Sequence, residues 1–91
     1  MARQNLVETL AMNQVVTTDP VTGNESFYSY GVLLASIDHE MGHIFLDEVY
    51  WDYSKTTMKW LTKFLGDKSA KEVRAKVKSG KYVIGQLNEW Y

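Results

Sequence analysis

A histidine-rich pattern in the middle of the chain has the spacing of a zinc site. His39, Glu40 and His43 form the sequence H-E-x-x-H. On a helix this spacing places two imidazoles on one face, where they can hold zinc, with a glutamate beside them as general base. Such a site would make the chain a very small metallopeptidase.

The segments on either side of this pattern favour a hairpin instead of a helix. Residues 26–37 and 43–51 are rich in aromatic and β-branched side chains, and each is long enough for a strand. Gly42 between them suits a tight reversal with a positive φ angle. The chain has no third histidine, and Asp47 is a weakly supported third ligand. We therefore predict no metal site, and the zinc peptidase stands only as an alternative.

The composition indicates one soluble globular domain that comprises residues 1–91. The chain has 91 residues, of which 45% are hydrophobic, and this suits a single ordered core. The absence of cysteine excludes disulfide bonds and a thiol nucleophile. No apolar run is long enough for a transmembrane helix, and the N-terminal residues lack the apolar segment of a signal peptide. We expect no membrane contact and a cytoplasmic location.

The first half of the chain predicts a small antiparallel sheet. Residues 11–18, 26–37 and 43–51 are the expected strands of a three-stranded meander, and turn-forming residues place a hairpin loop near 19–25. Residues 1–10 fit a loosely packed N-terminal arm or a short helix. The predicted fold class is therefore α+β, because helical patterns follow the strands.

Two amphipathic helices and a short last strand are expected after the sheet. Residues 54–65 carry apolar side chains at helical spacing, with a serine at the N-cap position and Gly66 directly after the last turn. Ser69–Glu72 has the pattern of a capping box that opens a second helix, and Gly80 ends it. Residues 81–85 then resemble a C-terminal strand.

Charge is divided unevenly along the chain. Residues 1–54 hold one basic and eight acidic residues, whereas residues 55–81 hold nine basic and two acidic residues. Such asymmetry indicates a charged partner. The acidic half predicts a partner-binding acidic surface that comprises Asp38, Glu40, Asp47, Glu48 and Asp52. The basic part predicts a phosphate-binding surface that comprises Lys55, Lys59, Lys63, Lys71, Arg74 and Lys78.

Several short motifs occur in a familiar order. They are Ser29-Tyr30-Gly31, Tyr53-Ser54-Lys55-Thr56-Thr57, Phe64-Leu65-Gly66 and Lys78-Ser79-Gly80-Lys81-Tyr82. In this order they resemble a family of short uncharacterised proteins encoded by bacteriophages, over residues 28–82. The resemblance implies a phage or prophage origin, a strand-strand-strand-helix order, and a hairpin turn at the H-E-x-x-H sequence. This chain has Trp60 where members often have histidine, and the family has no activity to transfer.

Three classes of function are compatible with these patterns. The first is a non-enzymatic phage accessory protein that binds a host or phage macromolecule in the cytoplasm of the infected bacterium, for example as an anti-CRISPR-like inhibitor of a defence nuclease. The second is a nucleic-acid-binding protein without sequence specificity that uses the basic helices at 55–81. The third is the zinc peptidase. A homodimer could also use the charge division, and we expect neither enzymatic activity nor a cofactor.

Overall fold

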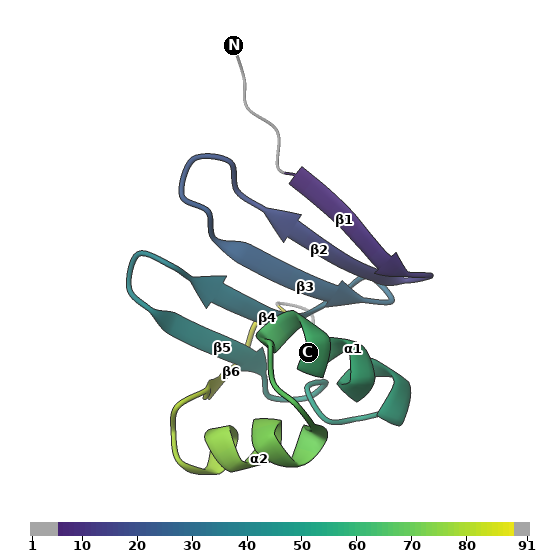
Figure 1. Ribbon diagram of the computed structural model, residues 1–91, viewed down its shortest axis with the longest axis vertical. Helices are drawn as coiled ribbons and strands as arrows, with labels where there is room; N and C mark the ends of the chain where they lie inside the picture. The colour runs from purple at the N-terminus through teal and green to yellow at the C-terminus, as the bar shows by residue number, and fades with distance from the viewer. Residues whose placement is uncertain (1–5, 89–91) are drawn as a thin grey trace.

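The computed structural model describes residues 6–88, which form one mixed sheet and two helices (Figure 1). In chain order the elements are β1 (Leu6–Ala11), β2 (Gln14–Thr18), β3 (Glu25–Ser29), β4 (Val32–Asp38), β5 (His43–Asp47), α1 (Lys55–Leu65), α2 (Ala70–Lys78) and β6 (Val83–Gly85). The strands lie side by side in this same order. The first five pair antiparallel, and β6 pairs parallel to β5. A parallel pair requires a crossover connection, which here contains α1 and α2.

The sheet contains six strands within residues 6–88, so the prediction of a three-stranded meander is wrong. One additional strand is β1, which replaces the arm or short helix predicted for 1–10. Its sequence LVETLA suits a helix as well as a strand, and pairing with β2 decides between the two. The predicted strand 11–18 is interrupted by a reversal at Met12 and Asn13, where Asn13 has a φ angle of 65°. Residues 1–5 lie outside the described range.

The predicted long strand 26–37 is also two strands, because the chain reverses at Tyr30 and Gly31. Their φ angles are 52° and 78°, and a two-residue hairpin can require positive values at both central positions. Tyrosine rarely adopts such a conformation, so the sequence alone predicts one continuous strand at this place and not a turn. The backbone N–H of Tyr30 donates to the carbonyl oxygen of Asn13 at 2.8 Å, which joins this turn to the β1–β2 turn.

The hairpin predicted at the H-E-x-x-H sequence is confirmed. β4 ends at Asp38 and β5 begins at His43, and Gly42 between them has a φ angle of 71°. The Asp38 carboxylate accepts hydrogen bonds from the backbone N–H groups of Glu40 and Met41 at 3.0 and 3.1 Å. When an aspartate side chain accepts hydrogen bonds from the backbone N–H groups of the residues that follow it, it favours a turn over the interior of a helix.

The two helices begin where the sequence predicts them. The side chain of Ser54 accepts a hydrogen bond from Thr57 N–H, and Ser69 accepts one from Glu72 N–H in the same way. Gly66 has a φ angle of 76° and ends α1 in the left-handed conformation. Within residues 6–88, no helix is long and apolar enough to cross a membrane.

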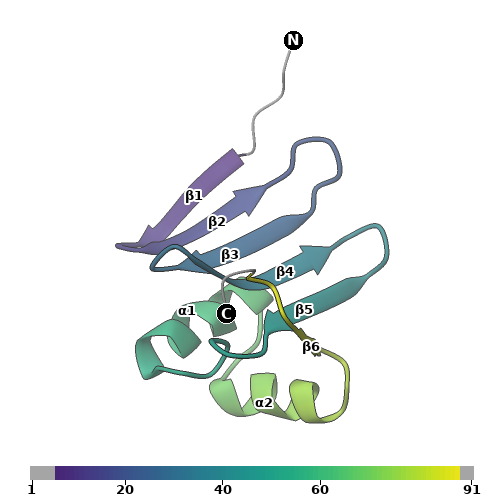
Figure 2. The same ribbon diagram turned by 180° about the vertical axis from the view of Figure 1, so that it is seen from behind.

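Helix α1 covers one face of the sheet. It lies in front of the strands in Figure 1 and behind them in the opposite view of Figure 2. The rings of Phe27 on β3 and Phe64 on α1 stack with their centroids 5.5 Å apart. Nearby, the buried hydroxyl groups of Ser29 and Thr57 form a hydrogen bond of 3.1 Å. The buried hydrophobic core comprises Val16, Phe27, Leu34, Ala35, Leu46, Met58, Leu61, Val73 and Tyr82.

A buried carboxylate ends the central part of the sheet. The strand predicted for 43–51 ends at Asp47, which is fully buried (0% exposed). One carboxylate oxygen accepts the backbone N–H groups of Val49 and Tyr50, and the other accepts Leu87 N–H and the Asn88 side-chain amide, all at 3.1 Å. Four donors therefore stabilise this carboxylate, which has to be desolvated in the folded state.

Asn88 completes the sheet where β5 has turned away. β5 pairs with β4 only from Ala35 onward, which leaves the backbone of Leu33 without a partner strand on that side. The Asn88 side chain accepts a hydrogen bond from Leu33 N–H at 3.2 Å and donates one to Leu33 carbonyl oxygen at 3.0 Å. One amide side chain thus takes the place of a strand residue, because it offers the same donor and acceptor.

Replacement of Asp47 by alanine is expected to destabilise the fold strongly. The substitution Asp47→Ala leaves four donors, among them the buried Asn88 amide, without their acceptor, and the free energy of unfolding should fall by about 3 kcal/mol or more. Urea denaturation measures this change. The control is Glu48→Ala, because Glu48 is the exposed neighbour and should change stability by less than about 0.5 kcal/mol. Equal stability of the two variants would contradict the role of Asp47.

Candidate functional site

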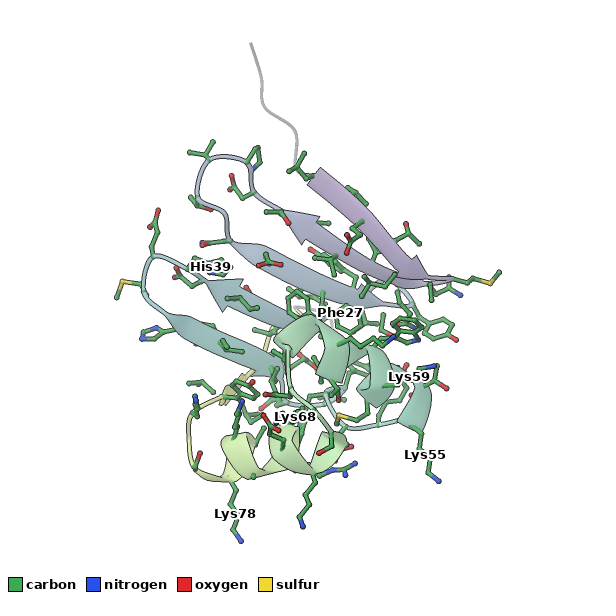
Figure 3. The ribbon with its side chains drawn as sticks, in the orientation of Figure 1. Phe27, His39, Lys55, Lys59, Lys68 and Lys78 are labelled. Carbon is green, nitrogen blue, oxygen red and sulfur yellow. The ribbon has the colours of Figure 1, made fainter. Side chains whose placement is uncertain are left out.

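The H-E-x-x-H residues lie on a hairpin turn and do not converge. His39 Nε2 lies 2.9 Å from the Oε1 atom of Glu25, and the His43 ring packs edge-on against Phe45. Figure 3 shows His39 at the hairpin end of the sheet, away from the helices. Within residues 6–88, no three histidine, aspartate or glutamate side chains are grouped in a way that could hold a metal ion. The helical face that the zinc alternative requires is missing at this motif.

The five acidic residues predicted as one surface are dispersed. Asp47 is buried and is therefore not a surface residue. Asp38 bonds to its own hairpin turn, and Asp52 bonds to an arginine of α2. Glu40 and Glu48 are exposed, but they lie at opposite ends of β5. Their side chains do not form a continuous acidic face.

A groove with a volume of about 630 Å³ lies between α1 and α2. Its lining residues are Lys55, Met58, Lys59, Thr62 and Lys63 from α1, Asp67, Lys68 and Ser69 from the connection, and Ala70 and Arg74 from α2. Five of these ten residues are basic and one is acidic. The groove therefore brings together cationic groups from three consecutive segments of the chain.

The structure gathers four of the six predicted basic residues at this groove. Lys71 and Lys78 are exposed on α2 but do not line it. Figure 3 shows Lys78 pointing away from the body of the molecule, whereas Lys68 lies between the two helices. Lys68 is a groove residue that the sequence pattern missed, because it belongs to the connection and not to a helical stripe. Only the packing of α2 against α1 could have identified it.

The ring of Trp60 positions the side chains of two groove lysines. The Nζ atoms of Lys59 and Lys63 lie 5.2 and 4.8 Å from the ring centroid of Trp60. An ammonium group at this distance is attracted by the ring. Trp60 itself is partly buried against the core. Its ring therefore holds both ammonium groups near the surface of α1, where neither has a carboxylate partner among residues 6–88.

Arg74 is held differently, by a pair of hydrogen bonds to Asp52. Its Nε and Nη2 atoms donate to the two carboxylate oxygens at 2.9 and 2.8 Å. These hydrogen bonds hold the pKa of the Asp52 carboxyl below its usual value. The pair fixes α2 to the loop that precedes α1 and leaves only part of the guanidinium for other ligands.

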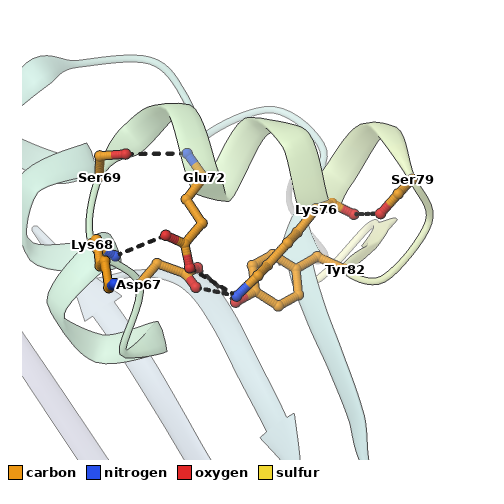
Figure 4. A network of polar contacts seen from close by, with 7 residues as sticks. All are labelled: Asp67, Lys68, Ser69, Glu72, Lys76, Ser79 and Tyr82. Atoms are coloured by element: carbon orange, nitrogen blue, oxygen red, sulfur yellow. Dashed lines mark hydrogen bonds and ion pairs between the residues drawn. The ribbon is translucent and has the colours of Figure 1, made fainter.

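The acidic residue of the groove, Asp67, is already bound inside the protein. Its side chain is 2% exposed and forms an ion pair with Lys76. The Tyr82 hydroxyl donates to its second oxygen at 2.6 Å, and Glu72 lies 3.2 Å from the same lysine (Figure 4). The negative charge of Asp67 is therefore neutralised beneath the groove, while the surrounding lysines carry theirs toward solvent.

This network shifts two pKa values in opposite directions. Burial alone would raise the pKa of Asp67, but the hydrogen bonds from Lys76 and Tyr82 outweigh it and place this pKa below its usual value of 3.8. Burial, together with the hydrogen bond to the Asp67 carboxylate, raises the pKa of Tyr82 to about 12. Both shifts favour an ionised Asp67 beside a neutral Tyr82.

The Asp67 network should make the fold sensitive to acid. Because the Asp67 pKa is lower in the folded than in the unfolded chain, its stabilising contribution is complete above pH 3.8 and is lost as the pH falls through the folded value. We expect Asp67→Asn to be less stable than the unsubstituted protein at neutral pH, and the difference to shrink in strong acid.

Urea denaturation over a series of pH values measures this difference. The control is Glu40→Gln, since Glu40 is an exposed carboxyl on the hairpin turn and should give a small difference at every pH. An Asp67→Asn difference that stays constant from neutral to strongly acidic pH would refute the assigned cause.

Comparison with known proteins identifies the family. The sequence model of a family of unknown function, DUF8033, matches residues 2–80, so the chain belongs to this family. Membership of an uncharacterised family agrees with the resemblance of the sequence motifs. No curated protein and no solved structure matches the chain.

Proposed function

We propose that this member of a family of unknown function is a non-enzymatic protein that binds nucleic acid through its phosphates, without sequence specificity. The observation that carries the proposal is the groove between α1 and α2, where five basic side chains surround one carboxylate that is already neutralised. In the setting that the resemblance implies, an infected bacterium, the ligand would be phage or host nucleic acid.

The electrostatics of the groove support a polyanionic ligand. Lys55, Lys59, Lys63 and Lys68 have no ion-pair partner among residues 6–88, so their charges remain available to phosphates. Binding of phosphates by lysines releases condensed counterions, and this release makes a large favourable contribution at low salt. The aliphatic stems of these lysines can lie along the groove while the ammonium groups reach solvent.

The arginine content argues against sequence-specific recognition of bases. Specific contacts in the major groove commonly use a bidentate arginine side chain. Arg74 is the only arginine among residues 6–88, and its guanidinium is already engaged by Asp52 through two hydrogen bonds. Contacts from lysines to phosphates determine position and affinity but carry no sequence information.

The alternative of a protein inhibitor that presents an acidic surface has less support. Such an inhibitor would compete for a nucleic-acid-binding surface by offering clustered negative charge. Asp47 is buried and Asp52 is bound to Arg74, which removes two of the five acids from that role. A stable complex with a bacterial protein, formed without any affinity for nucleic acid, would favour this alternative.

A matched pair of charge reversals tests the proposed groove. Lys59→Glu places a negative charge at the groove and should weaken binding of a short oligonucleotide about tenfold or more at low salt. Lys78→Glu makes the same change of net charge on an exposed residue outside the groove, so its effect should be much smaller. Fluorescence anisotropy of a labelled oligonucleotide measures both affinities.

The salt dependence provides a second measurement. Each phosphate contact to a single strand contributes about 0.7 to the slope of log affinity against log salt concentration. Lys59→Ala should therefore reduce this slope by about 0.7, and Lys78→Ala should leave it nearly unchanged. Absence of binding by the unsubstituted protein at low salt, or equal losses in the two variants, would overturn the proposal.

A further inference from the structure

Arg74 differs from the other basic residues of the groove because an internal carboxylate already binds it. Its Nε and Nη2 atoms donate to both carboxylate oxygens of Asp52, at 2.9 and 2.8 Å. The four groove lysines have no ion-pair partner among residues 6–88. The protein itself therefore occupies one of the five cationic side chains of the groove.

The edge of the guanidinium that Asp52 occupies is also an edge that suits a phosphate. The parallel N–H groups of an arginine fork match two oxygens of a carboxylate or two oxygens of a phosphate. Arg74 lines the groove, whereas Asp52 does not. The Asp52 carboxylate therefore stands where two phosphate oxygens could bind, at the border of the groove on the α2 side.

The ion pair is exposed enough for a ligand to replace Asp52. The side chains of Arg74 and Asp52 are 53% and 32% exposed. Exposed ion pairs contribute little to the stability of a fold, because water screens their charges. The Asp67 carboxylate, by contrast, is 2% exposed and has a second donor in Tyr82. A polyanion can therefore compete for Arg74 while the buried network beneath the groove stays intact.

Resting on the function proposed above, we propose that the Arg74 guanidinium is a latent phosphate site that Asp52 keeps occupied. Nucleic acid contacts the four groove lysines, and a phosphate that displaces Asp52 gains a fifth, bidentate contact. Asp52 limits the affinity of the groove for polyanions, because the internal ion pair has to break before this contact can form. Removal of the Asp52 charge should therefore strengthen binding.

The substitution Asp52→Asn tests this inference as a gain of binding. Asparagine has nearly the size of aspartate but no charge, so it competes poorly with a phosphate for the guanidinium. Affinity for a short labelled oligothymidine should rise about threefold or more at low salt. The slope of log affinity against log salt concentration should steepen by up to about 0.7, which corresponds to one additional phosphate contact. Fluorescence anisotropy measures both quantities.

A matched control separates this contact from a general change of charge. Glu48→Gln also removes one negative charge from the loop between β5 and α1, but Glu48 is exposed, does not line the groove and forms no ion pair among residues 6–88. Because exposed charges at a distance are screened, its affinity should stay within about twofold of that of the unsubstituted protein.

A double variant tests whether Arg74 carries the gain. The variant with both Asp52→Asn and Arg74→Gln has the net charge of the unsubstituted protein. It should bind with the same affinity as the unsubstituted protein, because Arg74 makes little contact with the ligand while Asp52 holds it. Melting curves of all variants report whether the fold is preserved.

The outcomes separate this inference from the function on which it rests. Equal affinities of Asp52→Asn and Glu48→Gln would overturn the latent site. Weaker binding by the double variant than by the unsubstituted protein would also overturn it, because Arg74 would then already contact the ligand. Both results would leave phosphate binding by the lysines intact. Absence of binding at low salt by the unsubstituted protein and by Asp52→Asn would overturn both the inference and the proposed function.

Discussion

The buried carboxylate of Asp47 is the constraint on which the arrangement of the chain depends. It stops β5 through hydrogen bonds to Val49 and Tyr50 and holds the C-terminal residues through Leu87 and Asn88. A carboxylate without these donors could not remain buried, because its desolvation would cost several kcal/mol (about 3–5). The same atoms therefore determine where the sheet ends, where the crossover begins and how the last strand returns.

The hydrogen bonds of Asp47 also help to position the groove between α1 and α2. The loop that leaves Asp47 carries Asp52, which holds Arg74 of α2, and then Ser54, which caps α1. Both helices are thus anchored to a loop whose start is fixed by hydrogen bonds to the buried Asp47 carboxylate. The second anchor is the network of Asp67, Lys76 and Tyr82, which joins the α1–α2 connection to the segment before β6. Together these contacts keep two positively charged helices adjacent despite their mutual repulsion.

Features set by local chemistry could be predicted from the sequence, whereas features set by pairing could not. Caps at Ser54 and Ser69 and the turn at Gly42 depend on a few neighbouring residues, and all are confirmed. β1 and the reversal at Tyr30 escaped prediction for a different reason. LVETLA becomes a strand only because β2 lies beside it, and Tyr30 adopts a positive φ angle that its residue type disfavours.

The candidate site shows the same division between local chemistry and pairing. This division explains why the charge of a segment only partly predicted which residues form the site. Helical spacing placed Lys55, Lys59 and Lys63 on one stripe of α1, and these residues do line the groove. A count of charges along the sequence assigns Asp52 to the acidic surface and Arg74 to the basic surface. In the structure the two side chains form an ion pair and neutralise each other. Because an ion pair removes one charge from each surface, the acidic half has no continuous acidic face, while none of the four groove lysines has an ion-pair partner within residues 6–88. The pattern of pairing, and not the total charge, determines which charged side chains remain without an internal partner at the surface of the helices.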